Sequence, residues 1–62
     1  MPLTGKAMLK LYLQNGWIID RINGSHYIVV KGRGRETIPV HSNRDLPKGT
    51  EGKLLKNLRS NQ

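Results

Sequence analysis

The stretch Asn23-Gly24-Ser25-His26-Tyr27 places a tight-turn signal between two runs of β-forming residues. Asn-Gly is the strongest short-range hairpin signal, because a type I′ turn needs a positive φ at both central residues. His26 should therefore open a strand. A histidine on a two-stranded ribbon is held in one direction, and its imidazole exchanges a proton near neutral pH. The turn thus predicts a hairpin and a candidate catalytic group.

The residues before this hairpin predict an amphipathic helix. Thr4 is suited to cap its start, and Asn15-Gly16 is suited to end it, with Gly16 in the left-handed conformation. An apolar arc of about 200° on the helical wheel is formed by Met8, Leu9, Leu11, Tyr12 and Leu13. This arc is wider than a small core needs. Part of it is therefore either buried by packing or left for a partner.

The rest of the chain predicts three strands and a second helix. The strands are expected at residues 17–22, 26–31 and 36–40, and residues 32–35 form the second hairpin loop. Pro39 cannot donate to a ladder, which points to a sheet edge or to the end of pairing. Thr50 is expected to cap the last helix, in which Leu54, Leu55 and Leu58 face the core.

These elements predict one α+β domain over residues 1–62 with the order α-β-β-β-α. Three antiparallel strands suffice for an independent sheet, and two helices on one face would bury that face. The longest apolar run, residues 27–30, is far too short to span a membrane. With no cysteine, the chain forms neither a disulfide nor a thiolate metal site, so we expect a cytoplasmic protein without a metal or cofactor.

The charge balance indicates a phosphate-bearing partner. Eleven lysines and arginines against four acidic residues leave a formal net charge of +7, which favours nucleic acid, although a merely solvated surface is the alternative. Arg33 and Arg35 are expected to project from a flexible hairpin loop, and Lys48 and Lys53 flank the start of the last helix, whose dipole favours an anion. The expected phosphate-binding residues are Gly24, Ser25, Lys31, Arg33, Arg35, Lys48 and Lys53.

Four segments in this order and spacing resemble the HicA family of bacterial toxins. They are Asn15-Gly16-Trp17, Gly24-Ser25-His26, residues 37–41 (TIPVH) and residues 45–50 (DLPKGT). The resemblance implies a fold similar to the double-stranded-RNA-binding domain and an endonuclease activity on messenger RNA. It also implies a HicB antitoxin as the inhibiting partner. In the family the catalytic histidine follows Gly-Ser, and only His26 occupies that place; many members carry a second histidine where this chain has Tyr27.

RNA cleavage without a metal needs three contributions. A base takes the proton of the 2′-hydroxyl, an acid protonates the departing 5′-oxygen, and positive charge surrounds the phosphate. His26 can be the base, and the acid could be His41, Tyr27, a lysine or water. Two other functions fit the same fold and charge. One is a non-catalytic module that binds RNA or the ribosome, and the other is a protein–protein contact through the first helix.

Overall fold

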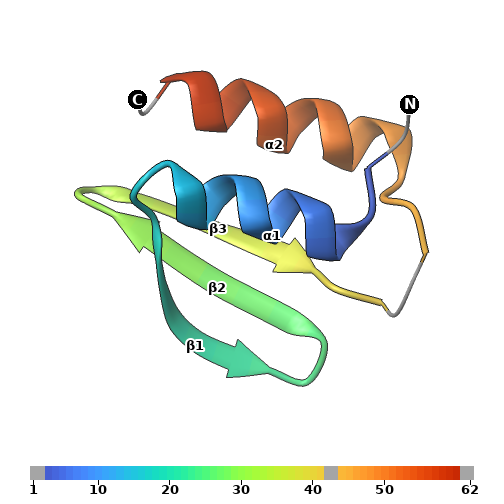
Figure 1. Cartoon of the computed structure of the whole chain (residues 1–62), viewed down its shortest axis with the longest axis horizontal. Coiled ribbons are helices and arrows are strands. Elements are labelled where there is room, and N and C mark those ends of the chain that lie inside the picture. Colours follow the sequence, from blue (N-terminus) through green and yellow to red (C-terminus); the bar gives the residue numbers. More distant parts are fainter. Residues whose placement is uncertain (1–2, 42–43, 61–62) are drawn as a thin grey trace.

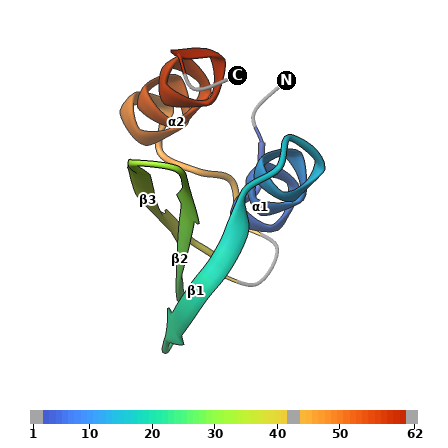
Figure 2. The same cartoon turned by 90° about the vertical axis from the view of Figure 1, so that its left-hand side faces the viewer.

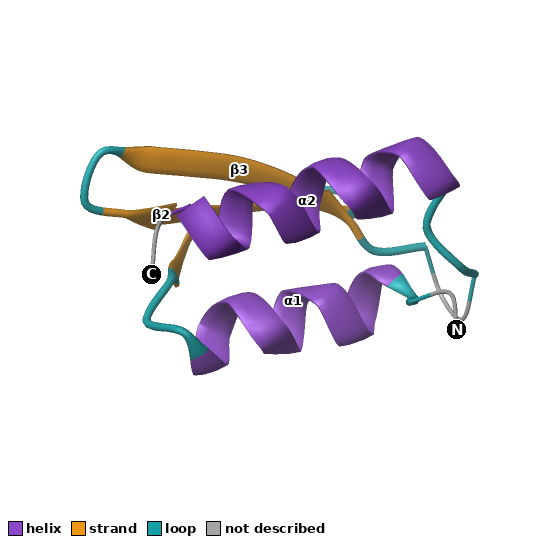
Figure 3. Cartoon of the chain, turned by 90° about the horizontal axis from the view of Figure 1, so that it is seen from above, coloured by secondary structure: helices purple, strands orange, loops and turns teal. Residues whose placement is uncertain are grey.

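The computed structural model describes residues 3–41 and 44–60 and has the expected order of elements (Figure 1). The elements are α1 (Gly5–Gln14), β1 (Ile18–Asn23), β2 (His26–Lys31), β3 (Gly34–Pro39) and α2 (Lys48–Ser60). The strands form one antiparallel sheet in the order β1-β2-β3. Both helices lie on the same face of this sheet (Figures 2 and 3). The predicted α+β fold, with the layout of a double-stranded-RNA-binding domain, is confirmed.

The ends of α1 follow the sequence signals. The Thr4 hydroxyl accepts a hydrogen bond from the Ala7 amide at 3.1 Å, and Gly16 has a φ of 93°. Met8 and Tyr12 are buried, whereas Leu13 keeps 40% of its surface exposed. Only part of the apolar arc therefore faces the core.

A single core joins the helices to the sheet. Its buried members are Met8, Tyr12, Trp17, Val29, Ile38, Leu46, Leu54 and Leu58. The Tyr12 ring packs edge-on against Trp17 at 4.8 Å between ring centroids, and its hydroxyl donates to the Leu54 carbonyl at 2.6 Å. Burial, with a smaller contribution from the nearby Glu36 carboxylate, raises the pKa of Tyr12 to about 12. The hydroxyl therefore stays protonated at neutral pH and keeps its donor role between α1 and α2.

Both hairpin turns differ in detail from the prediction. The first turn lies at Gly24-Ser25, because Asn23 still pairs with His26 as the last residue of β1. The second is only Gly32-Arg33, so Arg35 belongs to β3 and not to a flexible loop. Gly24 and Gly32 have φ values of 61° and 57°. Each two-residue loop therefore begins with the glycine that a primed turn requires at its first central position.

The last helix begins earlier than expected. The amide of Glu51 donates to the Pro47 carbonyl at 2.9 Å, so the helix starts at Lys48 and Thr50 lies in its first turn instead of capping it. The Glu51 carboxylate also accepts a hydrogen bond from the Leu3 amide. This contact joins the first turn of α2 to the segment that leads into α1.

The start of α1 sits directly against the end of β3. A Cβ atom at Gly5 would overlap the Pro39 carbonyl and would lie 2.9 Å from the Val40 Cα atom. These are backbone atoms of a paired strand, so they have little freedom to retreat. Glycine at position 5 thus permits the close approach of helix and strand.

We predict that Gly5→Ala destabilises the protein by roughly 1–3 kcal/mol, as overpacking does in a well-packed interior. Gly52→Ala is the matched control, because Gly52 lies within α2 with nothing within 4 Å of a Cβ atom. That change should stabilise the protein by about 0.5–1 kcal/mol, the cost of glycine in a helix relative to alanine. Chemical denaturation measures both. Equal stabilities for Gly5→Ala and the wild type would show that α1 is not seated on β3 in this way.

Candidate active site on the open face of the sheet

The strand register assigns the side chains of the sheet to two faces. Val29 and Ile38 are buried beneath the helices, and side chains alternate between faces along a strand. On β2, His26, Ile28 and Val30 therefore point away from the helices. We call this helix-free surface the open face. With their cross-strand neighbours, its residues are His26, Ile28 and Val30 on β2, Ile18, Arg21 and Asn23 on β1, and Arg35, Thr37 and Pro39 on β3.

The two histidines of the chain meet at one end of the open face. His26 pairs with Pro39, and the Val40 amide donates to the Ser25 carbonyl at 2.7 Å, which carries the chain past the end of β3 beside the first turn. His41 is the residue directly after Val40. The two imidazole rings lie 5.9 Å apart between centroids and are nearly perpendicular, at 82°. Both side chains are exposed, so a polyanion in solution can reach them.

The other candidate for proton transfer, Tyr27, lies on the opposite face. Its cross-strand neighbours are Ile22 and the buried Ile38, and Tyr27 itself is half-buried on the helix side of the sheet. Gly24 and Ser25 form the turn next to His26. Of the two residues expected to assist His26, the structure thus brings only His41 to it.

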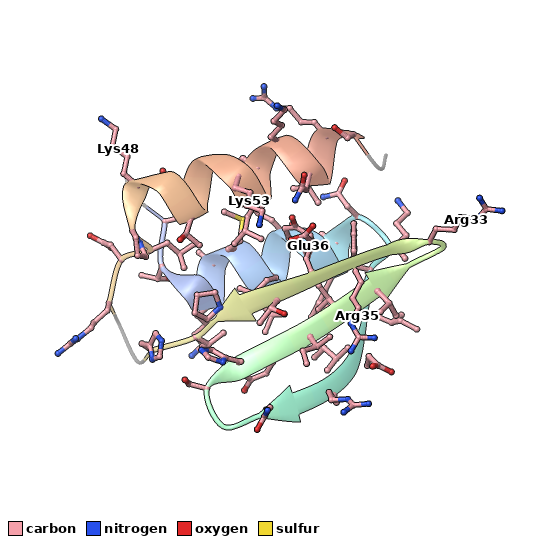
Figure 4. All side chains as sticks on the ribbon, turned by 180° about the vertical axis from the view of Figure 1, so that it is seen from behind. Arg33, Arg35, Glu36, Lys48 and Lys53 are labelled. Atoms are coloured by element: carbon pink, nitrogen blue, oxygen red, sulfur yellow. The ribbon has the colours of Figure 1, made fainter. Side chains whose placement is uncertain are left out.

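The expected phosphate-binding cations do not gather in one place (Figure 4). Lys48 and Arg33 lie at opposite ends of the molecule, and Lys53 lies on α2. At about 3.3 Å per residue, β2 separates Lys31 from His26 by roughly 16 Å, and Arg33 lies beyond it in the turn. The Lys31 ammonium donates to the Asn15 carbonyl at 2.7 Å, where it binds the C-terminal end of α1.

Asp20 forms ion pairs with two arginines of the sheet. The Asp20 carboxylate lies 3.9 Å from the Arg35 guanidinium and 3.7 Å from that of Arg21, where the register shift interrupts β1. All three side chains are well exposed. Such exposed ion pairs contribute little to stability, typically below about 1 kcal/mol, so both arginines remain available to a phosphate.

Two cations close to the histidines were missed by sequence reasoning. Arg21 pairs with Ile28, which places it on the open face one step diagonally from His26. The Arg44 amide donates to the His41 carbonyl at 2.9 Å, and its side chain is exposed. The position of Arg44 could have been anticipated from its spacing of three residues after His41. That of Arg21 could not, because it depends on the register shift in β1.

The arrangement supports proton transfer on a phosphate ester. Two exposed imidazoles, the groups most often used for general acid–base catalysis, lie in contact at the end of the sheet. One arginine lies diagonally across the sheet from His26 and another follows His41 by three residues. Within residues 3–41 and 44–60, no three His, Cys, Asp or Glu side chains come close enough to hold a metal ion. In the same part of the chain, neither helix has the length and apolar character needed to cross a membrane.

Comparison with known proteins identifies one family. The family described as the HicA toxin of bacterial toxin–antitoxin systems matches residues 5–59 of this 62-residue chain. The match includes both helices almost completely, all three strands and both histidines. None of the curated proteins compared with the chain matches it.

Proposed function

Because this chain belongs to the HicA family of toxins from bacterial toxin–antitoxin systems, we propose that it is an endoribonuclease that cleaves messenger RNA in the cytoplasm. His26 is the acid–base group of this reaction. The proposal rests on one observation above all: His26 stands exposed on the open face, beside a second imidazole. His26 lies on the face away from the helices, so packing in the core does not account for it.

The reaction uses the nucleophile that RNA carries. Neutral His26 takes the proton of a 2′-hydroxyl, the 2′-oxygen attacks the adjacent phosphorus, and the bond to the 5′-oxygen breaks. The products are a 2′,3′-cyclic phosphate and a free 5′-hydroxyl. We assign the stabilisation of the charge that develops on the phosphate to Arg21, which lies diagonally across the sheet from His26, and to Arg44, which follows His41 by three residues. This scheme requires no metal ion, because the attacking oxygen belongs to the substrate.

We predict that His26→Ala lowers RNA cleavage by about 10²- to 10⁴-fold, the usual contribution of general acid–base catalysis. The side chain is exposed, so the free energy of unfolding should change by less than about 0.5 kcal/mol. Cleavage by the wild type should persist in excess chelator and should fail on an RNA with a single 2′-deoxy sugar at the scissile position. Full activity of His26→Ala at equal folded concentration would remove His26 from the reaction. A wild type that binds RNA without cleaving it would favour the non-catalytic RNA-binding module.

The phosphate contacts can be tested with two exposed arginines that differ in their distance from the histidines. Arg44→Gln should flatten the salt dependence of RNA binding by about 0.7 in log K against log[salt] for one lost phosphate contact on a single strand. Arg33→Gln should flatten the salt dependence only for an RNA that is long enough to span the sheet. Fluorescence anisotropy measures the binding of a short oligonucleotide and distinguishes the two variants. A short RNA that loses affinity only in Arg33→Gln would place its phosphates at the far hairpin turn.

We further propose that the antitoxin is an acidic protein of the HicB type that covers the open face. This face combines basic groups with the apolar side chains of Ile18, Ile28 and Val30, and Ile18 is 64% exposed. A net charge of +7 speeds the encounter with an acidic partner. A protein seated on these residues would also exclude RNA from His26, which explains inhibition by occlusion.

We predict that Ile18→Ser weakens the toxin–antitoxin complex by tenfold or more, about 1.4 kcal/mol. Free Ile18→Ser toxin should cleave RNA normally, because Ile18 lies opposite Val30, roughly 13 Å along β2 from His26. Leu13→Ser is the control, since Leu13 is also exposed and apolar but lies on α1. Isothermal titration calorimetry measures both affinities. A loss of affinity confined to Leu13→Ser would move the antitoxin to the helical side.

A further inference from the structure

We infer that His41 is the second proton-transfer group of the site and acts as the general acid opposite His26. This inference rests on the proposed ribonuclease function and names the group that protonates the departing 5′-oxygen. Its basis is the contact between the two imidazoles, which the pairing of His26 with Pro39 and the hydrogen bond from the Val40 amide to the Ser25 carbonyl produce together.

The geometry suits two proton transfers on one phosphodiester. A general acid or base must come within about 2.6–3.2 Å of the atom that it serves. Attacking and departing oxygens lie on opposite sides of the phosphorus, so one group cannot reach both at the same moment. The two ring centroids are 5.9 Å apart and the rings are nearly perpendicular. One phosphodiester is therefore able to contact both imidazoles at once.

The other candidate groups are poorly suited to this role. The guanidinium group of an arginine supplies positive charge but no proton for catalysis, which excludes Arg21 and Arg44. The Asp20 carboxylate is engaged with arginines, Tyr27 lies on the helix side of the sheet, and Lys31 donates to the Asn15 carbonyl. Within residues 3–41 and 44–60, His41 is the imidazole that contacts His26, and it is open to solvent.

The proton balance of the step is complete. The 2′-oxygen loses its proton to neutral His26 and forms a bond to phosphorus. The bond from phosphorus to the 5′-oxygen breaks with its electron pair on the oxygen, which takes the proton of the His41 imidazolium. The enzyme leaves the step with His26 protonated and His41 neutral, and exchange with water restores both.

The test compares His41→Gln with His26→Gln on two substrates. One is an RNA with an ordinary scissile linkage, and the other has sulfur in place of the departing 5′-oxygen. A thiolate leaves without being protonated. An enzyme that lacks only its general acid should therefore regain its cleavage activity on the sulfur substrate. We expect His41→Gln to cleave the oxygen substrate at least about 10²-fold more slowly than the wild type. Its rate of cleavage of the sulfur substrate should be close to that of the wild type. His26→Gln should be impaired on both.

The pH dependence gives a second readout that a structural role would not move. The wild type should show a bell-shaped profile of kcat/KM, because one imidazole must be neutral and the other protonated. His41→Gln should lose the limb that falls at high pH. The charged residues on the neighbouring segments, which include Asp20 and Arg21 on β1 and Arg44 after His41, are the same in the wild type and the variant.

Three outcomes overturn the inference. His41→Gln with wild-type activity on the oxygen substrate would leave the acid role to another group. Equal losses on both substrates, with unchanged binding of an uncleavable 2′-deoxy RNA and an unchanged fold, would reduce His41 to a positioning residue. A wild-type protein that cleaves neither substrate would refute the ribonuclease function itself, which distinguishes that failure from a failure of His41 alone.

Discussion

The pairing register of β2 with β3 is the constraint on which both the core and the site depend. The two-residue turn at Gly32-Arg33 sets this register, and the positive φ of Gly32 makes so short a turn accessible. A slip of one residue would exchange the two faces of a strand. Val29 would leave the core, and His26 would turn towards the helices. The same pairing that buries the apolar side chains therefore holds the histidine in solvent.

The two faces of the sheet have different roles, because one packs against the helices and the other carries the candidate functional groups. The helices cover one face, where Gly5 lets α1 approach the end of β3 and the Tyr12 hydroxyl connects α1 to α2. A chain of this length has a small core, so nearly all of its stabilising contacts gather on that side. The open face is thus free to carry imidazoles, arginines and exposed apolar side chains. RNA and an antitoxin would compete for this one surface.

The sequence was sufficient for the order of elements because each has a strong local signal. Thr4 and Gly16 delimit α1, and the second strand was predicted correctly at both ends. The positions of the turns were harder to predict, because Asn23 can either form the turn or pair with His26. In the structure it pairs with His26. The start of α2 was misplaced because Thr50 resembles a cap, whereas the Pro47 carbonyl accepts the first helical hydrogen bond. His26 was indicated by its turn and by the family resemblance. Its proximity to His41 and Arg21 depends on the exact positions of the turns and on the register shift in β1, neither of which was predicted.

Nuclear magnetic resonance of the imidazole rings can show whether both histidines belong to one RNA site. The wild-type protein is titrated with an RNA that a 2′-deoxy sugar makes uncleavable. A cross-relaxation signal is expected between the rings of His26 and His41 in the free protein. Both rings should shift along one saturation curve as the RNA binds. Rings without mutual contact, or a shift of only one of them at saturating RNA, would contradict a single site for both histidines.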